Sequence, residues 1–219
     1  ERLRPYPDLL PKAMVPVNGR PIIEYQVHWM RSQGVTDVVF LTGYMGDKIE
    51  KHFGDGSEFG IVAHYSSEDT PLGRGGAIRQ GLSIVPADQN PVLITNGDNI
   101  TDLALKTLLD RHSETGAMAT MTLTRYPSQY GVVELGDGNL VEGFVEKGLL
   151  PVWINTGIYL FDREIETILP EVGDHEDTTF PALADMKRLA ALPSDALWLT
   201  VDSAKDLREA NEKLADWNP

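Results

Sequence analysis

Cysteine is absent from this chain of 219 residues, and several kinds of chemistry are excluded with it. Without thiols the protein forms no disulfide, builds no zinc ribbon and offers no cysteine nucleophile. Proteins of reducing compartments rarely contain disulfides, so the absence of cysteine fits a cytoplasmic protein.

Long apolar runs are also missing. No stretch of about 18 apolar residues occurs, so we expect no transmembrane helix and no membrane partner. A signal-peptide pattern is lacking as well. The chain starts at Glu1 and not at a methionine, so we expect further residues upstream.

Two widespread catalytic motifs do not occur. The chain has no G-x-S-x-G nucleophile elbow and no H-E-x-x-H zinc motif. Its five histidines are scattered and show no ligand spacing. The sequence therefore does not predict a serine hydrolase of that type or a zinc protease.

Positive charge is scarce, with 19 Lys and Arg against 33 Asp and Glu, for a net charge of −14. Phosphate backbones are bound by basic faces, so the balance argues against nucleic acid as a partner. The negative net charge argues only weakly against an anionic small substrate, because a few local cations can determine the potential of one pocket. The length predicts a single domain over 1–219.

Strands and helices alternate through the first half of the chain. A β-rich insertion follows (117–161), and the αβα pattern then returns. This order predicts an α/β fold, a three-layer α/β/α sandwich around a mostly parallel mixed sheet with a β-rich insertion. Ligands of such sheets bind at the carboxyl ends of the strands, so motifs should gather there.

Individual elements follow from periodicity and turn residues. We expect a hairpin over 130–147 that turns at Asp137 and Gly138. Expected strands include 36–43, 59–66, 91–98, 152–161 and 196–201. Expected helices include 21–33, 44–53, 101–116, 162–169, 178–190 and 203–216.

Five prolines fall within the first 21 residues. Each fixes its own φ and biases the preceding residue away from the α region, so an extended ribbon is predicted up to Ile22. Arg2 and Lys12 lie on this ribbon. From these residues alone, the plain interpretation is a solvated N-terminal arm.

Two acidic residues come directly after expected strands. "TNGD" (95–98) places Asp98 at the rim of the sheet, as a Mg²⁺ ligand or as a turn or cap residue for a helix that begins near Thr101. "TVDSAKDLREA" (200–210) places Asp202 after the last strand, where it or Ser203 could cap the final helix. If both carboxylates face each other, they can hold one Mg²⁺ between them.

Two further motifs have both a functional and a plain structural interpretation. "PLGRGGAIRQ" (71–80) holds three glycines before a helix, which would let backbone N–H groups approach an anion. "VEK" brings Glu146 and Lys147 beside "INTG" (154–157), which would suit the hydroxyls and phosphate of a sugar phosphate. A surface charge pair is the alternative for Glu146 and Lys147.

Taken together, the motifs resemble those of the sugar-1-phosphate nucleotidylyltransferases, also called NDP-sugar pyrophosphorylases. The likeness runs from Arg2 to Asn211 and rests on the opening "ERLRPYPDLLPKAMVPVNGRPIIEY" together with "FGDGSEFGI", "TPLGRGGAI", "NGDNITD", "YGVVEL", "FVEK", "INTGIYLF" and "TVDSAKDL". The compact mannose-1-phosphate and heptose-1-phosphate guanylyltransferases are the most similar members. The resemblance implies a Rossmann-like fold whose β-rich insertion binds sugar.

The resemblance also implies roles for particular residues. Arg2, Lys12 and Asp98 would be catalytic, the two cations holding the triphosphate and stabilising departing pyrophosphate. Asp98 and Asp202 would bind Mg²⁺. The nucleotide side would comprise Leu72, Gly73, Arg74, Gly75, Gly76, Asn96 and Gly97. The sugar-phosphate side would comprise Tyr130, Gly131, Glu146, Lys147, Asn155 and Thr156.

The implied reaction joins an NTP, with GTP favoured, to a mannose- or heptose-type sugar 1-phosphate, giving an NDP-sugar and pyrophosphate. The alternatives are uridylyl or thymidylyl transfer to glucose 1-phosphate, and transfer to a cyclitol or other specialised sugar phosphate. A silent regulatory paralogue that binds a nucleotide sugar is a third. Apolar residues near the insertion leave a homodimer open.

The chain departs from the family pattern in a missing segment and at two positions. The first strand and its glycine-rich loop would precede Glu1. Arg74 stands where threonine is usual, which leaves the choice of base open. Thr200 occupies a usual aspartate position, and Asp202, two residues later, matches the "V-D-T-x-K-D" subset and is the favoured ligand.

Overall fold

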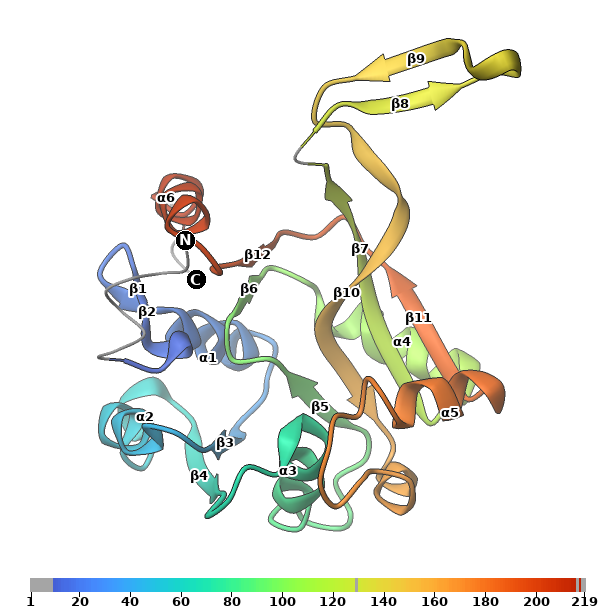
Figure 1. The fold of residues 1–219 in the computed structure, drawn as a ribbon. Helices are drawn as coiled ribbons and strands as arrows, with labels where there is room; N and C mark the ends of the chain where they lie inside the picture. The colour runs from blue at the N-terminus through green and yellow to red at the C-terminus, as the bar shows by residue number, and fades with distance from the viewer. Residues whose placement is uncertain (1–9, 129, 216, 218–219) are drawn as a thin grey trace.

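The structure is a computed structural model that describes residues 10–128, 130–215 and 217 (Figure 1). Its α-helices are α1 (Ile22–Ser32), α2 (Gly46–Phe53), α3 (Gly73–Leu82), α4 (Leu105–Thr115), α5 (Thr179–Asp185) and α6 (Ala204–Lys213). Its strands are β1 (Pro16–Val17), β2 (Arg20–Pro21), β3 (Asp37–Thr42), β4 (Val62–Ser67), β5 (Val92–Thr95), β6 (Asn99–Thr101), β7 (Ala119–Pro127), β8 (Val132–Leu135), β9 (Val141–Val145), β10 (Leu149–Phe161), β11 (Leu189–Pro193) and β12 (Trp198–Thr200). The 3₁₀ turns are η2 (Lys12–Met14), η3 (Ser57–Phe59), η4 (Asp137–Asn139) and η5 (Arg163–Thr167).

The main sheet has the strand order β11-β7-β10-β5, and β3 and β4 form a separate pair. The α/β class is confirmed, but the pairing is less parallel than expected. Among the described strands, β3–β4 and β7–β11 are the parallel pairs, and β10 is antiparallel to both of its neighbours. The insertion explains the antiparallel pairing of β7 and β10. The chain leaves along β7, reverses through the β8–β9 hairpin and returns along β10. A parallel pair would need a longer crossover connection.

Strand β10 separates two hydrophobic cores. Ile158 and Leu160 pack with residues of α1, α2 and α4, whereas Tyr159 and Phe161 pack with residues of α3 and α5. Successive side chains of a strand point to opposite faces, so this alternation shows that the strand is covered on both sides. The expected three-layer α/β/α arrangement follows from it.

The N-terminal segment folds back on the C-terminal helix. The expected extended ribbon is wrong for residues 12–21, which form the turn η2 and the tight β1–β2 hairpin. Proline tolerates such turns because it needs no N–H partner there. Val15, Val17 and Ile22 pack with Val201 and Leu214, so the segments that carry Lys12 and Asp202 are brought together.

At two places, residues predicted to be helical lie in a strand. Thr101 ends strand β6 and does not cap a helix; α4 begins at Leu105. The helix expected over 178–190 ends at Asp185, and residues 189–193 form β11 beside β7. The segment "LAALP" has good helix formers, so tertiary pairing overrides its local propensity.

The predicted hairpin is confirmed as β8 and β9, which extend away from the body of the molecule (Figure 1). Its turn contains Gly138 at φ 69°, in the left-handed region that glycine adopts readily.

None of the helices in the described part of the chain is long and apolar enough to cross a membrane.

His175 lies in the core beside the main sheet. It is 1% exposed and has edge-on ring contacts with Tyr159, Phe161 and Phe180. Neither ring nitrogen has a hydrogen-bond partner in the described structure, although Nδ1 lies 3.5 Å from Asp174 Oδ1. Burial lowers the pKa of His175, and this outweighs the opposing charge of Asp174.

This burial predicts a pH dependence of stability. Below about pH 6.5 the unfolded chain binds a proton at His175 that the folded protein resists, so the free energy of unfolding falls as the pH falls, by at most about 1.4 kcal/mol per pH unit. We expect His175→Leu to have a shallower slope between pH 6.5 and 5 than the unsubstituted protein. Urea unfolding at several pH values measures both slopes, and equal slopes would contradict the prediction.

Candidate functional site

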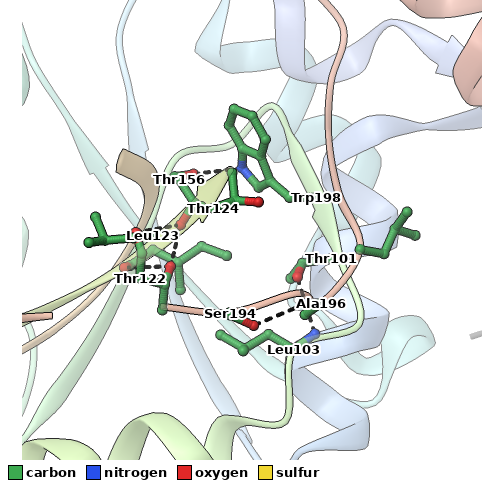
Figure 2. A pocket seen from close by; sticks show the side chains of 11 residues that line it. Thr101, Leu103, Thr122, Leu123, Thr124, Thr156, Ser194, Ala196 and Trp198 are labelled. Carbon is green, nitrogen blue, oxygen red and sulfur yellow. Dashed lines mark hydrogen bonds between the residues drawn. The ribbon is translucent and has the colours of Figure 1, made fainter. Parts of the chain in front are cut away.

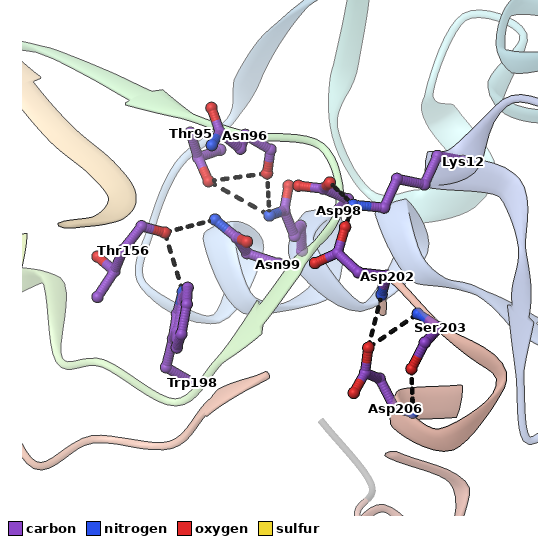
Figure 3. Close-up of polar contacts among 11 residues, drawn as sticks. Lys12, Thr95, Asn96, Asp98, Asn99, Thr156, Trp198, Asp202, Ser203 and Asp206 are labelled. Atoms are coloured by element: carbon purple, nitrogen blue, oxygen red, sulfur yellow. Dashed lines mark hydrogen bonds and ion pairs between the residues drawn. The ribbon is translucent and has the colours of Figure 1, made fainter. Parts of the chain in front are cut away.

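Three charged side chains from distant parts of the chain meet at one edge of the fold (Figure 3). Lys12 Nζ donates to Asp98 Oδ2 and to Asp202 Oδ1, each at 2.5 Å. Lys12 comes from η2, Asp98 follows β5 and Asp202 follows β12. The sequence prediction that the two carboxylates lie together at strand ends is therefore matched by the geometry.

Local packing holds Asp98 at this place. Gln26 of α1 is buried and donates from Nε2 to the carbonyl of Asn96 at 2.5 Å. A Cβ at Gly97 would lie 3.5 Å from Ala13 Cβ, so the turn after β5 runs closely beneath η2. The backbone of Asn96 also bonds to β10, its N–H donating to the carbonyl of Gly157 at 2.9 Å.

Asp202 is held by the cap of the last helix, although it is not the cap itself. Ser203 is the N-cap of α6 and forms a capping box with Asp206. The Asp206 carboxylate accepts from the N–H groups of Ser203 at 2.8 Å and Asp202 at 3.2 Å. Because these bonds satisfy the helix start, the Asp202 side chain stays available for Lys12.

The carboxylates also keep Lys12 charged. Burial by itself would lower the pKa of Lys12, but its hydrogen bonds to Asp202 and Asp98 and their negative charges outweigh burial and raise the pKa. Both carboxylates remain partly open to solvent, with 27% of the Asp98 side chain and 66% of the Asp202 side chain exposed. The arrangement can therefore bind a further charged group from solution.

In the glycine-rich segment, two backbone N–H groups already have a partner within the protein. The N–H groups of Gly75 and Gly76 donate to the carbonyl of Gly173, at 2.9 and 3.3 Å. A Cβ at Gly75 would lie 2.8 Å from the backbone nitrogen of His175. Glycine is required here because the 170–175 segment lies so close to α3. The assignment of Leu72 to Gly76 to the nucleotide stays a prediction.

Arg74 joins the glycine-rich turn to two acidic residues that the sequence reasoning missed. Its guanidinium lies 2.5 Å from Asp174 Oδ2 and 2.7 Å from Glu176 Oε2. Glu176 Oε1 also accepts from Asn155 Nδ2 at 2.9 Å and from the Tyr159 hydroxyl at 3.0 Å. One carboxylate thus ties the turn to β10. The acidic stretch "GDHED" (173–177) was the only sequence signal for it.

This network predicts that the Glu176 carboxylate stabilises the fold. Glu176→Gln replaces an acceptor facing Arg74 by an amide donor, so we expect the free energy of unfolding to fall by about 1–3 kcal/mol. Glu171→Gln is the matched control, because the Glu171 side chain is 86% exposed and lies 4.0 Å from Arg79. It should change stability by about 0.5 kcal/mol or less. Equal thermal and urea stability of both variants would contradict the prediction.

Thr156 is buried, and its side chain bonds within the protein. Its hydroxyl bonds to Thr122, and its carbonyl accepts from Asn99 Nδ2 at 2.6 Å and Trp198 Nε1 at 2.9 Å (Figure 3). The adjacent cavity has a volume of about 10 Å³ (Figure 2), which is room for one water and not for a sugar. Asn155 is likewise engaged through its side-chain amide.

The remaining predicted sugar-phosphate residues lie on the hairpin. Tyr130 is 80% exposed, and Glu146 and Lys147 are exposed at the end of β9. Gly131 packs beside Phe144, where a Cβ would clash with the ring. Their role stays a prediction, and Arg2 lies outside the described residues.

A family model described as nucleotidyl transferase matches residues 1–216. The chain belongs to the nucleotidyl transferase family. The resemblance stated from the sequence motifs is thereby confirmed over nearly the whole chain.

Curated relatives in this family include the mannose-1-phosphate guanyltransferases of Kluyveromyces lactis, 32% identical over 216 residues, and Candida albicans, 33% identical over 216 residues. Each alignment covers 94% of this chain and 59% of the relative, so the chain spans about three fifths of their length.

Solved structures share the fold. HddC from Yersinia pseudotuberculosis has a TM-score of 0.74 at 23% identity, covering 94% of this chain and 90% of HddC. A putative glucose-1-phosphate thymidylyltransferase from Bacillus anthracis, solved with sucrose, has a TM-score of 0.77 at 23% identity, covering 99% and 92%. The Rossmann-like nucleotidyltransferase fold expected from the sequence is therefore confirmed.

Proposed function

We propose that this nucleotidyl transferase family member joins GTP to a mannose- or heptose-type sugar 1-phosphate, giving a GDP-sugar and pyrophosphate. The observation that carries the proposal is the meeting of Lys12, Asp98 and Asp202 at the strand ends. The names of the relatives support guanylyl transfer to mannose 1-phosphate. A structure of HddC complexed with GMP-PN supports a guanine nucleotide.

The proposed chemistry needs no protein nucleophile. A phosphate oxygen of the sugar 1-phosphate bonds to the α-phosphorus of GTP, and the bond from that phosphorus to the oxygen bridging to the β-phosphate breaks. Pyrophosphate leaves with the electron pair. Because two anions must approach each other, the protein's work is to position them and to offset their charge.

Lys12 and the two aspartates have complementary parts in this proposal. Lys12 is a charged ammonium donor that would bind phosphate oxygens and stabilise the departing pyrophosphate. Asp98 and Asp202 are hard oxygen donors, and their shared contact with one lysine nitrogen places them close enough to share one cation, which suits Mg²⁺. When bound, Mg²⁺ would neutralise and orient phosphate oxygens. Arg2 is proposed to assist Lys12.

In the same proposal, the hairpin would bind the sugar phosphate through Tyr130, Gly131, Glu146 and Lys147. The protein would act in the cytoplasm.

We also propose a homodimer on the apolar face of the hairpin. That face exposes Val133, Leu135, Val141 and Phe144, each by 45% or more. Apolar faces of this kind commonly mark association surfaces.

Pyrophosphate release tests the choice of substrates. The protein is incubated with Mg²⁺ and each combination of GTP, ATP, CTP, UTP or dTTP with mannose, glucose, heptose or N-acetylglucosamine 1-phosphate. We expect release with GTP and a mannose- or heptose-type sugar 1-phosphate. Release confined to UTP or dTTP with glucose 1-phosphate would overturn the guanylyl assignment. Silence in every combination, with nucleotide still bound, would favour a regulatory protein or an unusual sugar phosphate.

A further inference from the structure

One lysine nitrogen lies between the two carboxylates that we propose as metal ligands. Lys12 Nζ is 2.5 Å from an oxygen of Asp98 and 2.5 Å from an oxygen of Asp202 (Figure 3). Two carboxylates so close repel each other unless a cation lies between them. In this structure the lysine ammonium is that cation.

The two carboxylates alone offer a divalent ion few ligands. In the described part of the chain, no group of three or more His, Cys, Asp or Glu side chains could hold a metal. Mg²⁺ in proteins is commonly bound through one or two carboxylates, with water and substrate phosphates filling the other positions. Without phosphate ligands, an entering ion would replace the Lys12 contacts with few new ones.

We propose that Lys12 is a placeholder cation, which competes with divalent metal for Asp98 and Asp202 in the nucleotide-free protein and moves to the triphosphate when nucleotide binds. The proposal rests on the proposed function, because the triphosphate is the second partner of Lys12. Thermodynamic linkage then requires that nucleotide and metal raise each other's affinity by the same factor.

The packing around the three residues allows this exchange. The Lys12 side chain is 38% exposed and has a flexible four-carbon stem, so its head can leave without opening the core. Asp202 is anchored through its backbone N–H to Asp206, and Asp98 lies in the turn whose preceding carbonyl is held by Gln26. The backbone that carries both carboxylates is therefore held in place when the ammonium moves away.

Mn²⁺ binding, measured by electron paramagnetic resonance on nucleotide-free protein, tests the competition. Lys12→Met removes the ammonium and keeps an unbranched side chain, so we expect about tenfold tighter Mn²⁺ binding than in the unsubstituted protein. Lys106→Met is the matched control, because Lys106 pairs with Asp110 on the exposed side of α4. The control should bind Mn²⁺ as the unsubstituted protein does. Equal or weaker binding by Lys12→Met, or no binding by either protein, would overturn the proposal.

Amine labelling of the unsubstituted protein tests the movement of Lys12 without any substitution. Brief acetic anhydride treatment followed by mass spectrometry gives the labelled fraction of each lysine. Mg²⁺ should increase labelling of Lys12, and Mg²⁺ with a non-hydrolysable GTP analogue should decrease it again, while Lys106 stays unchanged. Labelling of Lys12 that ignores Mg²⁺ would overturn the competition, and labelling that persists with the analogue would overturn the transfer to the triphosphate. Pyrophosphate release is measured separately, so either failure leaves the proposed function standing.

Discussion

Asp98→Asn is expected to lower kcat/KM for nucleotidyl transfer about a thousandfold, which corresponds to about 4 kcal/mol of transition-state stabilisation. The substitution keeps the size of the side chain and removes its negative charge. Asp98 is the less exposed of the two carboxylates that contact Lys12. The loss should appear mainly in kcat, because the charge that builds up on the phosphates is opposed only in the transition state.

Asp110→Asn is the matched control for this prediction. Asp110 is a partly exposed carboxylate that also pairs with a lysine, Lys106, at 2.7 Å on α4. The control should retain full activity, and both variants should have the thermal stability of the unsubstituted protein within a few degrees. Full turnover by Asp98→Asn would show that our assignment of this carboxylate is wrong.

Lys12→Met should lower kcat/KM by about two to three orders of magnitude. The ammonium is the cation that the structure places at the strand ends, and its loss leaves the triphosphate and the departing pyrophosphate less well neutralised. Steady-state kinetics at saturating Mg²⁺ measures the effect, with Lys106→Met as the control. Because the same variant should bind Mn²⁺ more tightly, metal affinity and activity should change in opposite directions.

Lys12→Arg separates charge from shape. Arginine keeps the positive charge but presents a planar fork, which cannot place one nitrogen between Asp98 and Asp202 as an ammonium does. We expect it to restore a minor part of the activity lost in Lys12→Met. Activity of Lys12→Met close to that of the unsubstituted protein would contradict a catalytic role for the ammonium.

The carboxylate pair could be predicted from sequence because its signals are local. Asp98 and Asp202 each follow a short, half-buried strand, and strand ends of an α/β fold gather at one edge. The capping alternatives at Asp202 could not be separated in the same way. The choice depends on Asp206, whose carboxylate completes the box with Ser203 only once the helix has formed.

Other contacts between distant segments could not be predicted. The N–H groups of Gly75 and Gly76 suited an anion by their pattern, but the carbonyl of Gly173 satisfies them. Gly173 is far from these glycines in the sequence, so no local pattern predicts this hydrogen-bond partner. The same holds for Glu176, which joins Arg74 to β10, and for β11, whose pairing with β7 overrides its helical composition.

Phosphorus NMR of the reaction mixture shows directly whether this protein makes a GDP-sugar and whether Asp98 is needed for it. The unsubstituted protein and Asp98→Asn are each incubated with GTP, mannose 1-phosphate and Mg²⁺, and the spectra are followed over time. We predict that diphosphate resonances of a GDP-sugar and the pyrophosphate resonance grow together with the unsubstituted protein and grow about a thousandfold more slowly with Asp98→Asn. Release of inorganic phosphate without GDP-sugar, or equal product from both proteins, would contradict this prediction.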